Sequence, residues 1–351
     1  MRIFCYFVEP ASYTLDMARN IHDKNQIDYC FIKSETLAVS NSSSNKVFLD
    51  RLSFFRKLKY LLSQFKRSNL IIIHGYNNYP FIITFLLNLF SLRKRFIATD
   101  SDTQLSIPKN LLKRLLKWAY LSLVFRNKYV LGFAGGSKTH KELFRYYGMI
   151  EDRIFLMPMM VDNKKFYCNN KVFPKPFTFL YVGRLLDTKN VDILCERFIN
   201  AFSDKNVELI IVGHGDNLSK FKKQYSHEKI KFKGGVFGQD LIKLYHNSSA
   251  FVFPSSVEAW GLVINEALSA GLPVIASKEV GACFDLIKDK DTGFIAEDMQ
   301  DFGQMMLTLF NDAELLKRYS KNASDLMQNS WNYDLYNNCL NTAIKKVEQW
   351  Q

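Results

Sequence analysis

The sequence is poor in cysteine, and its cysteines lie far apart. The 351 residues contain six of them and no Cys-x-x-Cys pair. Closely spaced cysteines mark structural zinc sites and the disulfide frameworks of small secreted proteins. Their absence argues against both and favours a protein of a reducing compartment. The six residues are Cys5, Cys30, Cys168, Cys195, Cys283 and Cys339.

Long apolar runs are also missing. The most apolar stretch, residues 80 to 92, is shorter than the roughly 20 residues that a membrane-spanning helix requires. Residues 1 to 10 do not resemble a secretory signal peptide, because Glu9 interrupts a short apolar run. The apolar content of 48% is ordinary for a globular protein, and the length allows two domains with full cores.

Acidic residues are scarce in the first half. Residues 1 to 172 contain 27 Lys and Arg against 12 Asp and Glu, a net charge of +15, whereas residues 173 to 351 carry a net charge of −2. Residues 54 to 67 and 109 to 125 each combine an apolar helical face with several cations. This pattern is typical of helices that lie on anionic lipid, although the apolar faces could instead pack on a sheet and leave the cations solvated. We expect an anionic membrane surface as a partner and no nucleic acid, because no known nucleic-acid-binding motif accompanies the charge.

Apolar runs alternate with helical patterns along the whole chain. Continuous runs such as residues 71 to 73 are typical of parallel strands that are covered on both faces. Polar residues 163 to 176, with two prolines, indicate an interdomain linker. The sequence therefore predicts an α/β protein with two Rossmann-like domains, residues 1 to 165 and 173 to 333, followed by a terminal helix in residues 334 to 351. The predicted strands are residues 2–8, 29–33, 70–74, 95–99, 130–134, 154–157, 177–182, 207–212, 230–233, 250–253, 273–276 and 293–295.

Two glutamates with seven residues between them, Glu258 and Glu266, are the most informative pair in the chain. Glu258 lies in the loop after a predicted strand, at the sheet edge where open parallel sheets bind ligands, and Glu266 lies inside the next helix. Carboxylates accept strong hydrogen bonds from hydroxyl groups. Gly261 allows close approach of the backbone, and the first helical amides, near Gly261 and Leu262, attract phosphate.

Residues 253 to 277 closely resemble the Glu-x7-Glu signature of family 4 retaining nucleotide-sugar glycosyltransferases, because Trp260, Gly261, Gly271 and Pro273 are in register with the two glutamates. That family has the GT-B fold, in which two Rossmann-like domains with parallel sheets face a central cleft. The resemblance implies that Glu258 contacts the donor sugar and Glu266 the ribose. The alternative interpretation is a helix-capping carboxylate and an ordinary surface glutamate.

A second signal follows the predicted strand at residues 177 to 182. Gly183 and Arg184 come directly after the strand, and Lys189 lies five residues further on. A departing diphosphate needs positive charge, which Arg supplies through a forked donor and Lys as a point charge. The family uses a Gly-Arg-Leu and a downstream Lys in this way, which assigns Arg184 and Lys189 to the leaving group; two surface cations are the alternative. No metal is expected, because the acidic residues near the predicted donor site show no Asp-x-Asp pair.

Weaker signals complete the donor side. Residues 232 to 238 resemble the family loop that holds the nucleotide base, which makes Val236 a candidate. Residues 280 to 287 resemble its Gly-rich loop and place Gly281 near the donor, whereas Asp285 could simply cap a helix. Residues 212 to 216 resemble a Gly-x-Gly turn.

The first half departs from the family pattern. Its first strand is followed by residues 8 to 13, which lack the glycines of relatives, and residues 100 to 102 are Asp-Ser-Asp where many relatives place a His. Asp100 is a candidate for accepting a sugar hydroxyl, or else it caps a turn. His74 at the end of another strand and His140 after a Gly-Ser loop are further acceptor-side candidates.

Together with these features, the resemblance to the family implies a retaining hexosyltransferase that moves a sugar from a nucleotide-diphosphate sugar, with UDP favoured over GDP, and needs no cofactor. The resemblance implies a lipid-linked or oligosaccharide acceptor in a bacterial surface glycan such as capsule, lipopolysaccharide or O-antigen. The expected location is cytoplasmic, peripheral on the inner face of the plasma membrane. The alternatives are a nucleotide-sugar 2-epimerase of the same fold and an inactive scaffold subunit of a glycan assembly complex.

Overall fold

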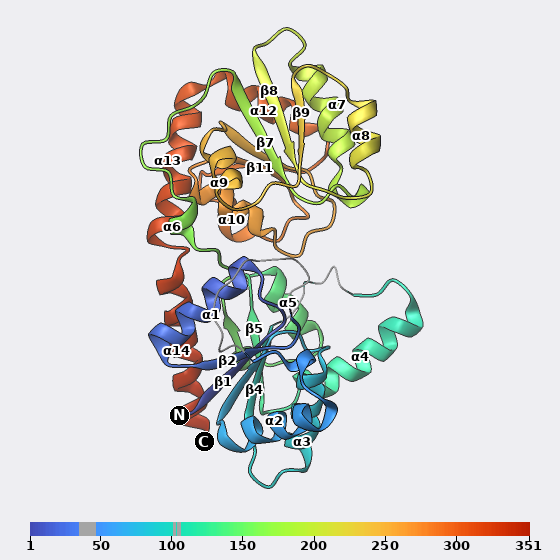
Figure 1. The fold of residues 1–351 in the computed structure, drawn as a ribbon, viewed down its shortest axis with the longest axis vertical. Helices are drawn as coiled ribbons and strands as arrows, with labels where there is room; N and C mark the ends of the chain where they lie inside the picture. Colours follow the sequence, from blue (N-terminus) through green and yellow to red (C-terminus); the bar gives the residue numbers. More distant parts are fainter. Residues whose placement is uncertain (35–46, 101–102, 104–106) are drawn as a thin grey trace. The chain divides into compact units, whose positions relative to one another are not determined.

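A computed structural model describes residues 1–34, 47–100, 103 and 107–351. The chain divides into two compact units (Figure 1). Unit 1 consists of Met1–Met160 together with Tyr333–Gln351, and unit 2 of Val161–Asn332. Asp102, the second aspartate of the Asp-Ser-Asp sequence, lies outside the described residues.

Unit 1 is built on a six-stranded parallel sheet with the order β2-β1-β3-β4-β5-β6. Its central strands are buried on both faces, which explains their unbroken apolar sequences; all four residues of β3, for example, are buried. Neighbouring strands pair in parallel, with Cys5 of β1 opposite both Tyr29 and Ile72. The strands are β1 (Ile3–Phe7), β2 (Asp28–Phe31), β3 (Leu70–Ile73), β4 (Phe96–Asp100), β5 (Val130–Ala134) and β6 (Ile154–Leu156).

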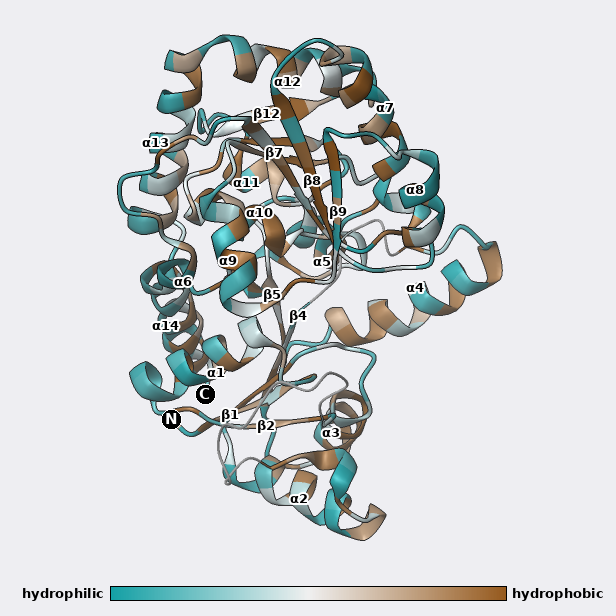
Figure 2. Cartoon of the chain, turned by 45° about the horizontal axis from the view of Figure 1, so that its top comes forward, coloured by the Kyte–Doolittle hydropathy of each residue, from teal (hydrophilic) through white to brown (hydrophobic). Residues whose placement is uncertain are grey.

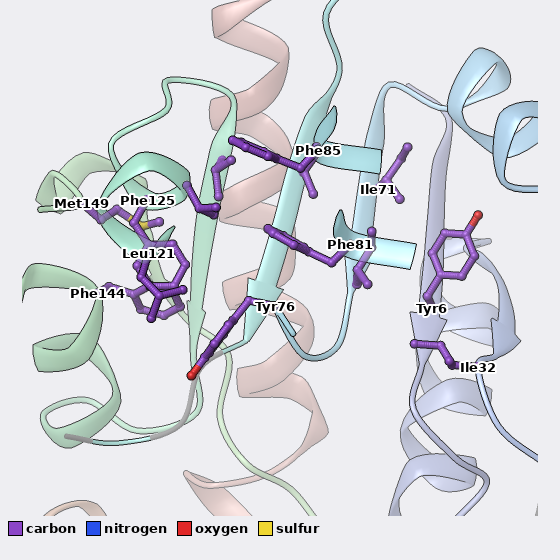
Figure 3. Packing of buried hydrophobic residues seen from close by; sticks show 14 of the residues in the cluster. Tyr6, Ile32, Ile71, Tyr76, Phe81, Phe85, Leu121, Phe125, Phe144 and Met149 are labelled. Atoms are coloured by element: carbon purple, nitrogen blue, oxygen red, sulfur yellow. The ribbon is translucent and has the colours of Figure 1, made fainter. Parts of the chain in front are cut away.

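Helices cover both faces of this sheet. The inner sides of α2 (Phe54–Arg67), α3 (Tyr79–Phe90), α4 (Leu111–Phe125) and α5 (Thr139–Tyr146) pack with one face of the strands in a single core cluster (Figure 3). Phe81, Phe85, Phe125 and Phe144 are among its largest helical side chains, each at most 4% exposed. Helices α1 (Ser12–Asn25) and α14 (Tyr333–Trp350) pack against each other, and α14 also contacts β6. Short 3₁₀ helices lie at Leu49–Arg51 and Glu151–Arg153.

Helix α4 departs from the packing of the other helices. Only its second half is buried, through residues such as Leu121 and Phe125, whereas residues 109 to 116 are exposed. The side chain of Asn110 caps its first turn by accepting a hydrogen bond from the Lys113 amide. The first half extends away from the sheet of unit 1, and Figure 2 shows apolar and polar residues alternating along it.

Unit 2 contains a second six-stranded parallel sheet, with the order β12-β11-β10-β7-β8-β9. Helix α12 packs against α7, and α10 packs against α13. The strands are β7 (Phe177–Val182), β8 (Val207–Val212), β9 (Ile230–Gly234), β10 (Ala250–Phe253), β11 (Val274–Ser277) and β12 (Gly293–Ala296). The helices are α6 (Asn163–Phe166), the 3₁₀ helix η4 (Asp187–Lys189), α7 (Val191–Ala201), α8 (Leu218–Gln224), α9 (Gly238–His246), α10 (Leu262–Ser269), α11 (Cys283–Leu286), α12 (Asp301–Asn311) and α13 (Ala313–Asn329).

The twelve strands predicted from the sequence are all present, and their ends shift by at most a few residues. The prediction of an interdomain linker at residues 163 to 176 is wrong. This segment belongs to unit 2, and the chain passes from unit 1 to unit 2 between Met160 and Val161. The buried Asn163 amide donates to the carbonyls of Met327 and Trp331, and Lys171 donates to two carbonyls at the end of α9. The polar composition of the segment suggested an exposed linker. Instead, these polar side chains form hydrogen bonds with buried carbonyl groups.

In the part of the chain that the structure describes, no helix combines the length and the apolar composition that a bilayer span requires. All six cysteines are free thiols.

Candidate functional site

The strand order of unit 2 indicates where a ligand would bind. The chain winds from β7 through β8 to β9 on one side and then returns to place β10, β11 and β12 on the other. Open parallel sheets bind ligands outside the carboxyl ends of the two strands at which this order reverses. Those strands are β7 and β10, and the loops after them carry Arg184 with Lys189 and Glu258, respectively. The topology thus brings together two sequence signals that lie far apart in the chain.

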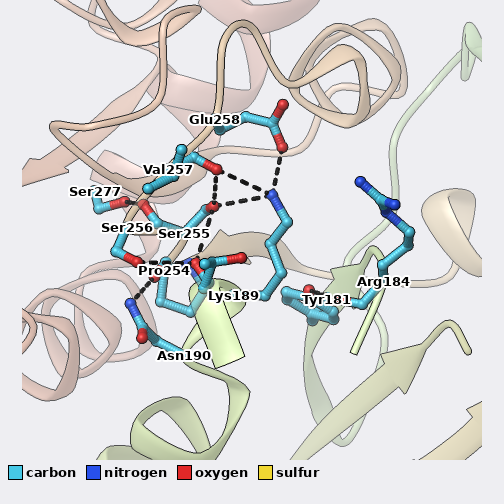
Figure 4. Close-up of polar contacts among 11 residues, drawn as sticks. Tyr181, Arg184, Lys189, Asn190, Pro254, Ser255, Ser256, Val257, Glu258 and Ser277 are labelled. Carbon is cyan, nitrogen blue, oxygen red and sulfur yellow. Dashed lines mark hydrogen bonds and ion pairs between the residues drawn. The ribbon is translucent and has the colours of Figure 1, made fainter. Parts of the chain in front are cut away.

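Lys189 is the centre of this site. Its Nζ lies 2.7 Å from Glu258 Oε2, donates to Ser255 Oγ at 3.0 Å and lies 3.3 Å from the Val257 carbonyl (Figure 4). It also lies 5.5 Å from the centroid of the Phe253 ring. Lys189 is 7% exposed, whereas a quarter of the Glu258 side-chain surface remains accessible. Lys189 is therefore fixed in place, and Glu258 keeps a free side that faces outward.

Further contacts hold the two loops against each other. Asn190 adopts a left-handed conformation with φ of 48°, and its side-chain amide donates to the Pro254 carbonyl at 2.8 Å. The Ser256 amide donates to the Thr188 carbonyl at 2.9 Å, and the Ser277 hydroxyl donates to the Ser255 carbonyl. The position of Lys189 relative to Glu258 is consequently set by the backbones of both loops.

Arg184 is the exposed cation of the site. Its side chain is exposed, and its carbonyl accepts a hydrogen bond from the buried Tyr181 hydroxyl at 3.0 Å. Burial raises the pKa of Tyr181 above its usual value, so this phenol remains a neutral donor. Arg184 thus has an anchored backbone and a guanidinium group on the surface, which suits a cation that meets an incoming anion.

Two glycines let the loops approach closely. A Cβ on Gly213 would lie 1.8 Å from the Gly183 carbonyl oxygen, and one on Gly281 would lie 2.0 Å from the Ala259 carbonyl oxygen. The Gly281 amide donates to the Glu258 carbonyl at 3.1 Å. Gly281, a donor-side candidate from the sequence, therefore supports the backbone of the Glu258 loop.

Helix α10 begins next to Glu258. Gly261 precedes it in a left-handed conformation with φ of 92°, which glycine adopts without strain, and Leu262 is its first residue. The first backbone amides of this eight-residue helix point toward the carboxyl ends of the strands. The N-terminus of a helix attracts anions. Val236 lies between β9 and α9 and is half-buried. Asp285 lies within α11, is 9% exposed and does not precede a helix as a cap would.

Glu266 lies on α10 and accepts a hydrogen bond from a side chain inside unit 2. The hydroxyl of the fully buried Tyr245 donates to Glu266 Oε2 at 2.7 Å. Burial raises the pKa of Glu266 to about 7, although the hydrogen bond from Tyr245 opposes this shift. One carboxylate oxygen is thus held by α9, and the protonation of Glu266 changes near neutral pH.

Unit 1 has its own strand-order reversal, between β1 and β3, and the acceptor-side candidates gather there. His74 Nδ1 lies 2.8 Å from Asp100 Oδ2, and the Gly75 amide donates to Asp100 Oδ1 at 2.5 Å. The His74 ring stacks on Phe7 with 4.7 Å between ring centroids. Burial raises the pKa of Asp100, but His74, the Gly75 amide and His140 together outweigh it and hold the pKa below its usual value. Asp100 is therefore an ionised carboxylate that orients His74.

His140 is buried at the start of α5 and is 3% exposed. Burial lowers its pKa to about 4, despite the nearby Asp100, so its ring is neutral at physiological pH. Among the residues that the structure describes, no group of three His, Cys, Asp or Glu side chains is arranged to hold a metal ion.

Sequence reasoning missed Ser255 and Tyr245, which hold Lys189 and Glu266. Ser255 lies three residues before Glu258, inside the segment that carries the signature, so its position was a usable signal. Tyr245 lies on a different helix from Glu266, and no spacing in the sequence links the two. The pairing of Lys189 with Glu258 was also unforeseen, since the sequence analysis gave them separate roles.

Residues 163–326 match the family model described as glycosyl transferases group 1. The matched region resembles a glycosyl transferase group 1 domain in its sequence. It contains every donor-side residue named above and nearly all of unit 2.

Curated relatives resemble parts of this chain. The uncharacterized glycosyltransferase MJ1607 of Methanocaldococcus jannaschii is 34% identical over 119 residues, covering 32% of this chain and 30% of that protein. The capsular polysaccharide biosynthesis glycosyltransferase CapM of Staphylococcus aureus is 26% identical over 276 residues, covering 75% of this chain and 67% of CapM. For the first three curated relatives, the match spans only 30% to 49% of their length.

The fold of the whole chain has solved counterparts. The crystal structure of Anabaena HepE in complex with UDP matches with a TM-score of 0.76 at 17% identity and covers 98% of this chain and 100% of HepE. The two parallel sheets and this structural neighbour confirm the GT-B fold that the sequence predicted.

Proposed function

We propose that the protein is a retaining hexosyltransferase that moves a sugar from a nucleotide-diphosphate sugar to a saccharide acceptor. The observation that carries the proposal is the placement of Lys189, Arg184 and the Glu258 carboxylate around the strand-order reversal of a glycosyl transferase group 1 domain. Cations and helix amides suit a diphosphate, and carboxylates suit sugar hydroxyls.

In the proposed reaction, Glu258 accepts hydrogen bonds from the donor sugar, and Glu266 accepts them from the ribose. The bond between the anomeric carbon and the diphosphate breaks while the acceptor oxygen bonds to that carbon on the same face. The departing diphosphate takes the acceptor proton. Arg184, Lys189 and the first amides of α10 stabilise the charge that develops on the leaving group.

UDP is the proposed nucleotide, supported by the fold shared with HepE, which was crystallised with UDP. The backbone of the β9–α9 loop around Val236 would hold the base. A lipid-linked saccharide of a bacterial surface glycan is the proposed acceptor, supported by the likeness to CapM, a capsular polysaccharide glycosyltransferase. The proposed location is the cytoplasmic face of the plasma membrane, where such acceptors are assembled. His74, oriented by Asp100, is the proposed contact for the acceptor, because its buried Nε2 has no hydrogen-bond partner among the described residues.

Thermal-shift measurements with UDP-, GDP- and ADP-sugars test the donor. A ligand that binds only the folded protein stabilises it by mass action, by about 2.7 kcal/mol at a hundredfold excess over its Kd. UDP-sugars should raise the unfolding temperature most, and the rise should vanish in Arg184→Ala. The absence of a shift with all three donor classes would contradict the proposal.

Product analysis separates the alternatives. The transferase should slowly hydrolyse its donor without an acceptor, releasing the free sugar. Release of a sugar with an inverted carbon 2 would instead show a 2-epimerase, and an intact donor after prolonged incubation would show an inactive scaffold.

A treatment with EDTA tests the charge assignment. We expect turnover to survive it, because Arg184, Lys189 and the α10 amides supply positive charge at the diphosphate. Loss of turnover that Mn²⁺ restores would show that a metal does this work.

A further inference from the structure

Helices α2, α3 and α4 of unit 1 carry most of the large apolar side chains that are exposed in the described part of the chain. Phe54 and Phe55 at the start of α2 are 73% and 80% exposed, and Phe90 at the end of α3 is 86% exposed. On α4, six such side chains are between 42% and 69% exposed: Leu111, Leu112, Leu115, Leu116, Trp118 and Leu123.

These side chains are not a poorly filled core. The inner sides of the same helices are buried through Leu61 and Phe65 of α2, Phe81 of α3, and Leu121 and Phe125 of α4. The helices therefore have a second, outward apolar side. Exposed apolar side chains in this number mark an interaction site. We call the outward sides of α2, α3 and α4 the α2–α4 surface.

The charge of the α2–α4 surface has a single sign. The three helices contain no Asp or Glu, whereas α2 and α4 contain eight Lys and Arg. A groove of about 510 Å³ along the outer side of α2 combines the two chemistries, being lined by Phe55, Leu58, Leu62, Ser63, Lys59, Lys66 and Arg67. A ligand that fits here must offer both negative charge and apolar volume.

We propose that the α2–α4 surface docks on an anionic lipid bilayer. Helical spacing gathers Leu111, Leu112, Leu115 and Leu116 on one side of α4, so this half-helix can lie at the boundary between headgroups and acyl chains, ~5–10 Å deep. The exposed Lys109, Lys113 and Arg114 beside this leucine face reach lipid phosphates. Their long side chains span the distance from the helix to the headgroups.

The structure corrects one detail of the charge pattern read from the sequence. Lys117 continues the spacing of Lys109 and Lys113, but its Nζ lies 5.7 Å from the centroid of the Tyr76 ring, and the residue is half-buried. On the same side, the Tyr120 hydroxyl donates to the Tyr76 carbonyl at 2.8 Å. Lys117 therefore faces unit 1 and takes no part in the docking surface.

Other occupants fit these observations less well. In a symmetric dimer of this chain the same surface would meet itself, and cations would face cations with no acidic side chain on the three helices to balance them. A nucleic acid would match the charge but would leave the leucines of α4 in water. Dimer formation and nucleic-acid binding are both outcomes that the experiments below would detect.

Sedimentation of the full chain with lipid vesicles tests the proposal, and it needs neither donor nor acceptor, so its result is independent of the transferase proposal. Binding should require phosphatidylglycerol and be absent with phosphatidylcholine alone. It should weaken as salt rises from about 0.1 to about 1 M, because the Debye length falls from ~10 to ~3 Å.

Two variants of α4 separate charge from apolar insertion. Lys109→Gln, Lys113→Gln and Arg114→Gln together should weaken vesicle binding ~100-fold, at roughly fivefold for each cation near an anionic surface. Leu112→Ser with Leu116→Ser should also weaken binding, and this loss should persist at high salt. The changed side chains are all exposed, so circular dichroism should show an unchanged fold.

Matched controls lie in unit 2. Lys220→Gln, Lys222→Gln and Lys223→Gln on α8 remove the same charge from exposed positions, and Tyr167→Ser with Val172→Ser remove two exposed apolar side chains. Both should bind vesicles like the unchanged protein. Equal losses in controls and α4 variants would overturn the proposal. So would self-association that the leucine variant abolishes without vesicle binding, or salt-sensitive binding to duplex DNA or RNA in place of vesicles.

Discussion

At the scale of single residues, the two cations of the proposed donor site are held in different ways, and their removal should have different effects. Arg184→Ala removes an exposed guanidinium group. Its loss should lower turnover about a hundredfold, because one such contact is worth ~3 kcal/mol in the transition state. The unfolding temperature should not change, and steady-state kinetics with calorimetry measure both quantities.

Lys189→Ala should lower turnover as strongly and should also destabilise the protein. The change leaves the partly buried Glu258 without its 2.7 Å partner, which costs about 1–3 kcal/mol. Lys243→Ala is the control, because Lys243 pairs with Asp240 in an exposed ion pair at 3.0 Å that contributes little. Turnover of Lys189→Ala within threefold of the unchanged protein would contradict the role given to this residue.

The buried contact of Glu266 predicts a dependence of stability on pH. Its pKa is raised to about 7 by burial, so the folded state retains the proton at pH values where the unfolded chain has lost it. This contribution to stability is present below the ordinary pKa of glutamate and is lost as the pH rises through about 7. Glu266→Gln keeps an acceptor for the Tyr245 hydroxyl but cannot ionise.

The unfolding temperatures of Glu266→Gln and the unchanged protein should therefore be close at about pH 5. At about pH 8 the variant should be the more stable by about 3 kcal/mol. Equal stability of the two proteins at both pH values would show that Glu266 ionises freely.

At the scale of structural elements, the proposed donor site depends on loops whose backbones are in direct contact. Gly281→Ala would place a Cβ 2.0 Å from the Ala259 carbonyl oxygen and push the Glu258 loop away. We expect a loss of about 1–3 kcal/mol in stability and a higher KM for the donor.

Gly303→Ala is the matched control. Gly303 lies inside α12, where a Cβ would meet its nearest atom at 3.6 Å, an ordinary contact. This change should stabilise the protein by about 0.5–1 kcal/mol, because glycine is unfavourable inside a helix. A Gly281→Ala protein that is as stable as Gly303→Ala would contradict the close packing of the two loops.

At the scale of the whole molecule, the chain completes unit 1 only with its last helix. The buried Leu340 of α14 belongs to unit 1, and Asn337 exchanges side-chain hydrogen bonds with Asn20 and Asn25 of α1. Leu340→Ala should lower the stability of unit 1 by about 2–5 kcal/mol. Hydrogen exchange followed by peptide should show faster exchange in the strands of unit 1 and unchanged exchange in those of unit 2.

Leu309→Ala changes a fully buried position of α12 in unit 2. It should speed hydrogen exchange in the strands of unit 2 and leave exchange in those of unit 1 unchanged. A uniform increase in both units after Leu340→Ala would show that the two units unfold together.

The sequence by itself determined the strands and the two Rossmann-like units, because continuous apolar runs and their alternation with helical patterns are local signals. The resemblance carried by its two motifs implied the GT-B fold. Tertiary structure alone decided which side chains meet. Lys189 and Glu258 lie on different loops and pair only because β7 and β10 are neighbours in the sheet. Tyr245 reaches Glu266 from another helix.

The dependence on tertiary contacts also explains why the sequence did not decide the roles of residues 163 to 176 and of α4. The polar residues 163 to 176 resemble a linker until their buried hydrogen bonds with distant carbonyls are known. The apolar face of α4 is equally compatible with a packed core and with a lipid surface in the sequence. Only the fold shows that its first half is exposed among the described residues, because burial depends on which elements approach, and helical periodicity alone does not specify them.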